Sequence, residues 1–165
     1  ALKKILFDYG EERFAPQIAA AIVRAREKKP IESTAELSDI VKYAIPSAAR
    51  EGGHHPAKRS FQAIRIEVNA ELDVIEPAIR DAVSLLNKGG RIAIITFHSL
   101  EDRMVKQKFK EYCTGCTCPP DFPVCVCGKT PAGRLFTKKP IEASQKELDE
   151  NPRSRSAKLR VIIKN

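Results

Sequence analysis

The chain has 165 residues, 42% of them hydrophobic, and 29 Lys and Arg residues against 21 Asp and Glu give a formal net charge of +8. This length and composition allow a buried core and argue against a disordered chain. No apolar run approaches the roughly 18 residues of a membrane-spanning helix, and the charged opening is unlike a secretory signal, so a cytoplasmic protein with no membrane partner is expected.

The start of the chain is predicted to form a small helical domain. Apolar residues at helical spacing indicate helix over residues 2–28, with an interruption at Gly10. Ser33 and Glu36 fit a capping box, so a short helix should begin there. We assign residues 1–54 to this helical domain.

Beyond residue 54 the pattern changes to that of an α/β domain. Two helices are predicted first, one opened by Pro56 and one over residues 73–87 that a glycine turn ends. The apolar run RIAIITF at residues 91–97 predicts a buried, parallel strand, and Ser99 is expected to cap the following helix. Two weaker strands are predicted in GRLFTKKPI and AKLRVIIK. The helix opened by Pro56 is expected to bury one face, made of Phe61, Ile64, Val68 and Leu72.

Basic residues concentrate in the segments HHPAKRSFQAIR and NPRSRSAKLR. Such clusters suit the phosphate backbone of a nucleic acid, although a solvated protein surface is the commoner explanation. Arginine and glutamine side chains on the first segment could contact phosphates and base edges. The candidate RNA-binding residues in the two segments are Lys58, Arg59, Gln62, Arg65, Arg153, Arg155 and Lys158.

The segment TFHSLEDR lies where an open α/β sheet would gather functional groups. His98 and Ser99 follow the predicted strand, beside helix amides that could bind an anion. For His98 a functional role and a structural hydrogen-bonding role are both open. The chain has no G-x-S-x-G elbow, G-x-G-x-x-G loop or Walker loop, so neither a hydrolase nor a nucleotide-cofactor pocket of its own is expected.

All five cysteines lie in CTGCTCPPDFPVCVCG, residues 113–128, spaced C-x2-C-x-C-x6-C-x-C. Stable disulfides are disfavoured without a secretory signal, and the odd count leaves one thiol unpaired. The two C-x-C arms could close a tetrahedral thiolate site for a structural zinc, and a plain reduced loop is the main alternative. Cys113 could replace one ligand. The most symmetric ligand set is Cys116, Cys118, Cys125 and Cys127.

Three stretches, HPAKRSFQAIRIEVNAEL, FHSLEDRMVKQKF and NPRSRSAKLR, resemble the RsmH (MraW) family of S-adenosylmethionine-dependent methyltransferases. That family methylates the exocyclic amine of a cytosine in small-subunit ribosomal RNA. The resemblance covers nearly the whole chain. It implies a Rossmann-like sheet of order 3-2-1-4-5-7-6, to which this chain would supply strands 5, 6 and 7. Residues 1–54 would be the inserted helical domain and residues 55–165 the C-terminal part of the methyltransferase domain.

The family's glycine-rich cofactor loop and aspartate-containing segment have no counterpart in this chain. The resemblance therefore implies an enzyme fragment, inactive alone, with no residue of its own for S-adenosylmethionine. It further implies that His98 and Ser99 lie near the target base and that Arg103 joins the RNA-binding arginines. The alternative is a self-standing basic RNA-binding or ribosome-associated module with a zinc-stabilised loop.

The resemblance also carries an expectation about assembly. Strand 5, at RIAIITF, would lack its neighbour strand 4 and would become an exposed apolar edge. Because such an edge recruits other chains, the isolated chain is expected to self-associate.

Overall fold

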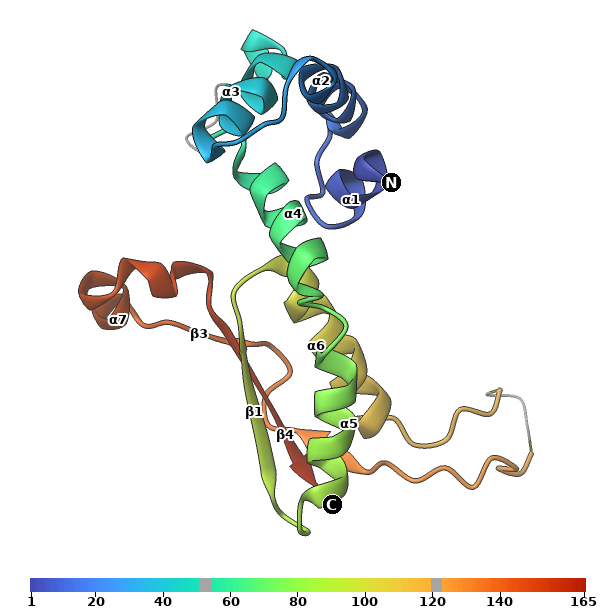
Figure 1. Ribbon diagram of the computed structural model, residues 1–165. Helices are drawn as coiled ribbons and strands as arrows, with labels where there is room; N and C mark the ends of the chain where they lie inside the picture. The colour runs from blue at the N-terminus through green and yellow to red at the C-terminus, as the bar shows by residue number, and fades with distance from the viewer. Residues whose placement is uncertain (51–54, 120–122) are drawn as a thin grey trace. The chain divides into compact units, whose positions relative to one another are not determined.

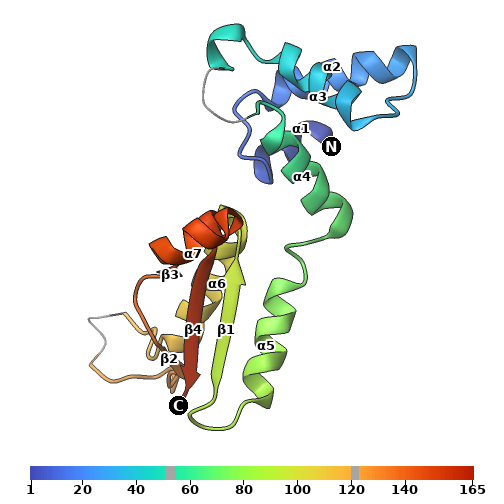
Figure 2. The ribbon, with the colours of Figure 1, turned by 90° about the vertical axis from the view of Figure 1, so that its left-hand side faces the viewer.

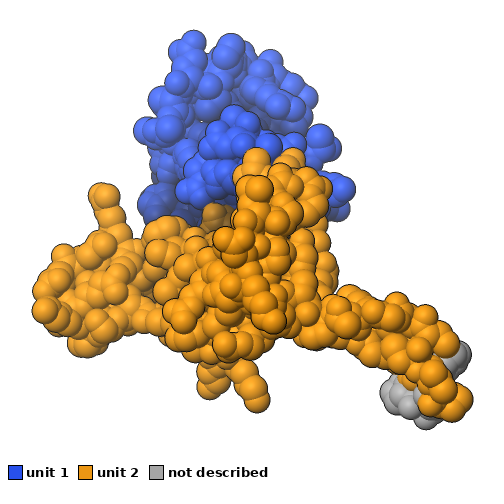
Figure 3. Space-filling view, turned by 90° about the horizontal axis from the view of Figure 1, so that it is seen from below, with its two compact units in different colours: residues 1–71 blue, residues 72–165 orange. Residues whose placement is uncertain are grey.

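The computed structural model describes residues 1–50, 55–119 and 123–165. These residues form two compact units, 1–71 and 72–165 (Figure 3). The last residues of the predicted helical domain, 51–54, lie outside the described residues, and the assignment of residues 1–54 to an inserted domain stays a prediction. Every described helix is too short or too polar to cross a membrane.

The first unit is built from helices only. The helical pattern does break around Gly10 as predicted, since α1 ends at Asp8. Close packing requires glycine at position 10, because a Cβ there would lie 2.6 Å from Leu6 O and 2.9 Å from Arg59 O. The Ser33 cap is also confirmed, since its Oγ accepts a hydrogen bond from Glu36 N at 3.1 Å. The elements are α1 (Leu2–Asp8), α2 (Ala15–Lys28), α3 (Thr34–Ala44), the 3-10 turn η1 (Ser47–Ala49) and α4 (Lys58–Asn69).

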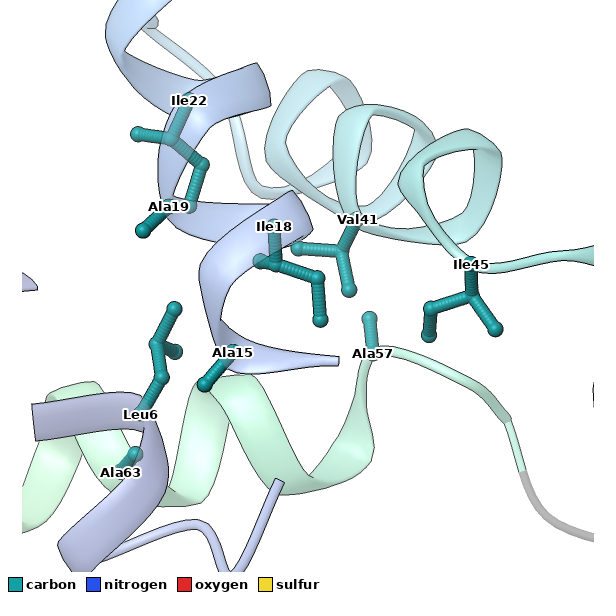
Figure 4. Close-up of a cluster of buried hydrophobic side chains, with 9 residues drawn as sticks. All are labelled: Leu6, Ala15, Ile18, Ala19, Ile22, Val41, Ile45, Ala57 and Ala63. Atoms are coloured by element: carbon teal, nitrogen blue, oxygen red, sulfur yellow. The ribbon is translucent and has the colours of Figure 1, made fainter. Parts of the chain in front are cut away.

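Small and branched apolar side chains fill the core of this unit (Figure 4). Four of them are alanines, which let the helix backbones approach closely, and aliphatic side chains of α1, α2 and α3 occupy the space between. The core residues are Leu6, Ala15, Ile18, Ala19, Ile22, Val41, Ile45, Ala57 and Ala63.

Helix α4 buries a different face from the one its large apolar residues predict. Ser60, Ala63 and Ile66 are buried at helical spacing, whereas Val68 is 77% exposed. The prediction of an inward Val68 is wrong because α1 packs on the stripe of small residues, which allows the closer approach. Pro56 also lies two residues before the first residue of α4 rather than opening it.

Ser60 supplies a test of this packing. Its hydroxyl is fully buried and has no hydrogen-bond partner among the described residues. We expect Ser60→Ala to raise the free energy of unfolding by about 1 kcal/mol, because a buried unsatisfied hydroxyl is penalised and alanine favours the helix. Urea denaturation measures the change. A destabilised variant would show that the hydroxyl makes a hydrogen bond in solution.

The second unit combines helices with a small antiparallel sheet (Figure 1), so the expected mixed α/β class is confirmed. The strand order is β1-β4-β2, and β3 also pairs with β4. Its elements are α5 (Ile75–Leu85), β1 (Arg91–Thr96), α6 (Ser99–Cys113), β2 (Gly133–Leu135), β3 (Ile141–Glu142), α7 (Gln145–Glu150), the 3-10 turn η2 (Pro152–Ser156) and β4 (Lys158–Lys164).

Strand β1 differs from its prediction in two respects. It runs antiparallel to β4, and its residues alternate between a covered and an exposed face instead of being buried on both. Ile92 and Ile94 pack with Phe109 beneath α5 and α6, while Ile95 on the other face is 59% exposed. The two helices lie on the same face of the sheet (Figure 2), and no other described helix of the second unit covers Ile95 on the opposite face of β1.

The turn between α5 and β1 is fixed by the last strand. Helix α5 ends at Leu85, earlier than the predicted glycine stop, and Lys164 Nζ donates to Val83 O at 2.9 Å and Leu86 O at 2.6 Å. These bonds satisfy carbonyl groups that a helix end leaves free. Gly89 follows with φ of +78°, a left-handed conformation that glycine adopts at little cost.

Candidate nucleic-acid interface and metal centre

The junction between β1 and α6 is held by a capping box that lies one residue earlier than predicted. His98, not Ser99, is the N-cap residue: its Nδ1 accepts from Glu101 N at 3.4 Å, and Glu101 Oε2 accepts from His98 N at 3.2 Å. His98 Nε2 lies 3.3 Å from Glu101 Oε1, and the two groups form an ion pair only if the imidazole is protonated. This contact does not meet the geometry of a hydrogen bond. Ser99 is exposed at the first helical position. The structure thus gives His98 a structural role, and a catalytic role for His98 and Ser99 stays a prediction.

One turn into α6, Asp102 joins the helix to the sheet. Arg160 of β4 donates from Nε and Nη2 to the two carboxylate oxygens at 2.7 and 3.0 Å, and both side chains are almost buried, at 12% and 11% exposure. Lys158 Nζ lies 3.8 Å from the same carboxylate. The Arg160 hydrogen bonds lower the pKa of Asp102 below its usual value and outweigh the raising effect of burial. Asp102 thereby anchors β4 to the first turns of α6.

The segment NPRSRS displays its two arginines through its own local structure. Asn151 Oδ1 caps the turn η2 by accepting from Arg153 N at 3.3 Å, and the hydroxyl of the buried Ser154 donates to Asn151 O at 2.8 Å. With Ser154 turned inward, Arg153 and Arg155 on either side are exposed and make no ion pair with any described residue. A pair of cations held this way on a short rigid turn can bind phosphate groups.

The basic candidates on α4 have different surroundings. Lys58 and Arg59 are exposed, and Arg59 donates to Glu11 O at 3.4 Å. Gln62 is partly buried. Arg65 makes a bidentate pair with Glu71, at 2.7 and 2.9 Å, so a phosphate would have to compete with that carboxylate.

The candidate RNA-binding residues therefore fall on both compact units. Lys58, Arg59, Gln62 and Arg65 belong to the first unit, and the remaining four belong to the second, namely Arg103, Arg153, Arg155 and Lys158. Their contacts with RNA stay predictions. The residue that sequence reasoning undervalued is Arg160, whose position opposite Ile94 on the covered face of β1 marks it as inward-facing.

The four cysteines of the two C-x-C arms gather their sulfur atoms in one place. The sulfurs of Cys116, Cys118, Cys125 and Cys127 all lie within 4.8 Å of one another. Cys125 Sγ lies 3.6 Å and Cys116 Sγ 3.7 Å from Cys127 Sγ. This set could hold a metal ion, and part of the PPDFPV segment between the arms, residues 120–122, lies outside the described residues.

The thiols of this loop differ in acidity. The N–H groups of Lys129 and Thr117 donate to the Cys127 sulfur and lower the pKa of that thiol to about 5, so it is a thiolate at neutral pH. Burial raises the pKa of the Cys113 thiol. Cys113 ends α6 and packs against the core of the second unit, which separates it from the four clustered thiols.

Comparisons with known proteins agree with these motifs. The model of the MraW methylase family matches residues 1–165, which is the whole chain. A protein of Ruminiclostridium cellulolyticum named ribosomal RNA small subunit methyltransferase H is 57% identical over 161 residues, 98% of this chain and 51% of the relative. Proteins of the same name from a Paenibacillus species and from Symbiobacterium thermophilum are 60% and 55% identical over 163 residues, 99% of this chain and 52% and 51% of the relatives.

The chain spans about half the length of the curated relatives it matches. The span matched by the family model includes the basic turn η2 and the junction before α6. The chain belongs to the MraW methylase family.

Proposed function

We propose that this chain is the C-terminal portion of a methyltransferase that modifies the exocyclic amine of a cytosine in small-subunit ribosomal RNA. The observation that carries the proposal is 55–60% identity, over nearly the whole chain, to proteins named ribosomal RNA small subunit methyltransferase H. The enzyme acts in the cytoplasm, where its RNA substrate is found.

The sheet supports this assignment. The family resemblance implies that strand 5 neighbours strand 7 and that strand 7 neighbours strand 6. The observed order β1-β4-β2, with β3 also beside β4, has the same neighbours if β1 is strand 5, β4 is strand 7 and the short strands β2 and β3 form strand 6. In this assignment the unpaired edge of β1 is the position of strand 4.

The residues of this chain are poorly suited to hold S-adenosylmethionine. The amides at the junction after β1 are already engaged, because Glu101 accepts from the amides of Phe97 and His98 at 2.8 and 3.2 Å. None of the described residues is therefore assigned to the cofactor. The part played by this chain is to bind RNA and to support the β1 edge of the sheet.

A chimera tests the enzymatic proposal. The segment of the Paenibacillus relative that precedes its matched region would be joined to this chain, and methylation would be measured on small subunits that lack the cytosine modification. We expect methyl transfer by the chimera and none by the 165-residue chain. Two results together would contradict the proposal: a folded chimera that transfers no methyl group, and equal RNA affinity of the chain and the chimera. The chain would then be a stand-alone RNA-binding module.

The chimera also tests the proposed place of His98 near the target base. Asparagine can replace the histidine as the N-cap of α6 but lacks the imidazole. Full methylation by the His98→Asn chimera would leave His98 with its structural role only, and Ser99→Ala tests the neighbouring hydroxyl in the same assay.

Arg153 and Arg155 are expected to contribute directly to RNA affinity. We expect Arg153→Ala/Arg155→Ala to weaken binding of small-subunit ribosomal RNA at least tenfold and to reduce the slope of log affinity against log salt by about 1.4–1.8, the range for two lost phosphate contacts on single-stranded or duplex nucleic acid. Filter binding over a salt series measures both quantities. The exposed pair Lys3→Ala/Lys4→Ala removes the same charge and should change the slope less. Equal effects of the two double variants would indicate nonspecific attraction by net charge.

A further inference from the structure

The four clustered sulfurs have the spacing of a tetrahedral metal site. Zinc binds thiolates at about 2.3 Å, so the sulfurs at two corners of a tetrahedron lie about 3.8 Å apart. The distances from Cys127 Sγ to Cys125 Sγ and to Cys116 Sγ, 3.6 and 3.7 Å, are close to that edge length. A disulfide would require about 2.05 Å, and all of these cysteines are free thiols.

Hydrophobic burial does not explain why these sulfurs gather. Three of the four cysteines are exposed, and Val124 and Val126, on either side of Cys125, are 70% and 73% exposed. The loop extends away from the sheet of its unit (Figure 1). A loop whose apolar side chains are exposed while its sulfurs lie close together is the arrangement of a small metal knuckle, in which the ion takes the place of a core.

The base of the loop is already fastened to the second unit. Ala132 N donates to Tyr112 O at 2.8 Å, and Asn165 Nδ2 donates to Pro131 O at 2.9 Å. The first bond joins the two ends of the loop, where the chain leaves α6 and returns toward β2, and the second ties the returning end to Asn165 after β4. The four sulfurs lie beyond these hydrogen bonds, closer to the tip of the loop. A metal ion bound there would be a second link between the two sides of the loop and would restrict its motion.

We propose that Cys116, Cys118, Cys125 and Cys127 bind one Zn²⁺ ion as a structural tetrathiolate site. With four thiolates the coordination sphere is closed to water, so the ion fixes the two C-x-C arms relative to each other and takes no part in the methyl transfer. Cys113 is outside the site, because it packs in the core at the end of α6. This proposal stands on the geometry of the loop and does not depend on the proposed RNA substrate.

Metal analysis of the 165-residue chain tests the site. Protein purified under reducing conditions without chelators should contain one equivalent of zinc by elemental mass spectrometry, with iron measured in parallel. Cys127→Ser and Cys116→Ser should each lower the zinc bound at limiting free metal at least tenfold. The matched control Cys113→Ser should keep one equivalent, and hydrogen exchange should show that β1 and β4 remain folded in every variant.

Two further measurements report on the role of the ion. Cobalt in place of zinc should give the intense visible absorption of a tetrahedral thiolate site. Chelation should increase hydrogen exchange in residues 113–119 and 123–131 and leave the sheet unchanged. The proposal is overturned by a chain that binds no zinc after reduction and reconstitution, by iron as the bound metal, by a disulfide among the four cysteines, or by a loss of zinc in Cys113→Ser equal to that in Cys127→Ser.

Discussion

Replacing Asp102 with alanine is expected to lower the free energy of unfolding by about 3–5 kcal/mol, the cost of removing one partner of a buried ion pair. The carboxylate receives both hydrogen bonds of the Arg160 guanidinium and lies near Lys158. Without Asp102, the Arg160 charge stays almost buried with no compensating anion. Loss of an exposed surface ion pair would lower the free energy of unfolding by less than about 1 kcal/mol. Urea denaturation therefore distinguishes a buried ion pair from an exposed one.

A double variant separates the lost attraction from the unpaired charge. We expect Asp102→Ala/Arg160→Met to recover much of the stability lost in Asp102→Ala, because an apolar pair of similar volume leaves no buried charge. If the double variant is as unstable as the sum of the single variants, the carboxylate and the guanidinium stabilise the unit independently, and the proposed coupling between α6 and β4 is wrong.

The same pair predicts a pH dependence. The pKa of Asp102 is lowered in the folded state, so its contribution is complete above the usual pKa of 3.8 and is lost as the pH falls through the lower folded value. The wild-type chain should therefore lose stability below about pH 4 more steeply than Asp102→Ala does. Identical slopes for the two chains would mean that Asp102 has an ordinary pKa.

Sequence periodicity predicted most of the helices, yet it missed details that depend on side-chain chemistry. The capping rule favours serine, so it selected Ser99. The structure selects His98, because Glu101 three residues later completes the reciprocal bonds from the correct position. The polar stretch before β4 carried no apolar pattern, so α7 and η2 were not predicted, although Ser144 and Asn151 cap them.

The sheet shows a different limit of sequence reasoning. A short apolar run indicates a strand but does not identify its neighbour, so the antiparallel pairing of β1 with β4 could not be read from RIAIITF. In contrast, C-x-C spacing alone selected the four cysteines whose sulfurs the structure brings together. Short sequence separations constrain local geometry strongly, whereas strand partners are set by contacts between distant parts of the chain.

The unpaired edge of β1 leads to the second large expected effect, a change of association state. In the described part of the second unit β1 pairs only with β4, and its outward face presents Ile95, followed by Phe97 at 58% exposure. We expect the 165-residue chain to self-associate through this edge at high concentration, since exposed backbone groups beside apolar side chains favour pairing with a second strand. Multi-angle light scattering over a concentration series measures the mass.

Ile95→Lys is expected to return the chain to a monomer. Lysine on an edge strand opposes pairing because each added strand would bring like charges together, and the change should alter stability little at a position already 59% exposed. The matched control is Leu85→Lys, an equally apolar-to-charged change at the 85% exposed end of α5, which should leave association intact. A monomeric wild-type chain at high concentration would contradict the prediction. If both variants dissociate equally, the added positive charge acts nonspecifically and β1 is not shown to be the contact. If only Ile95→Lys loses association, β1 is the edge with which a neighbouring strand pairs.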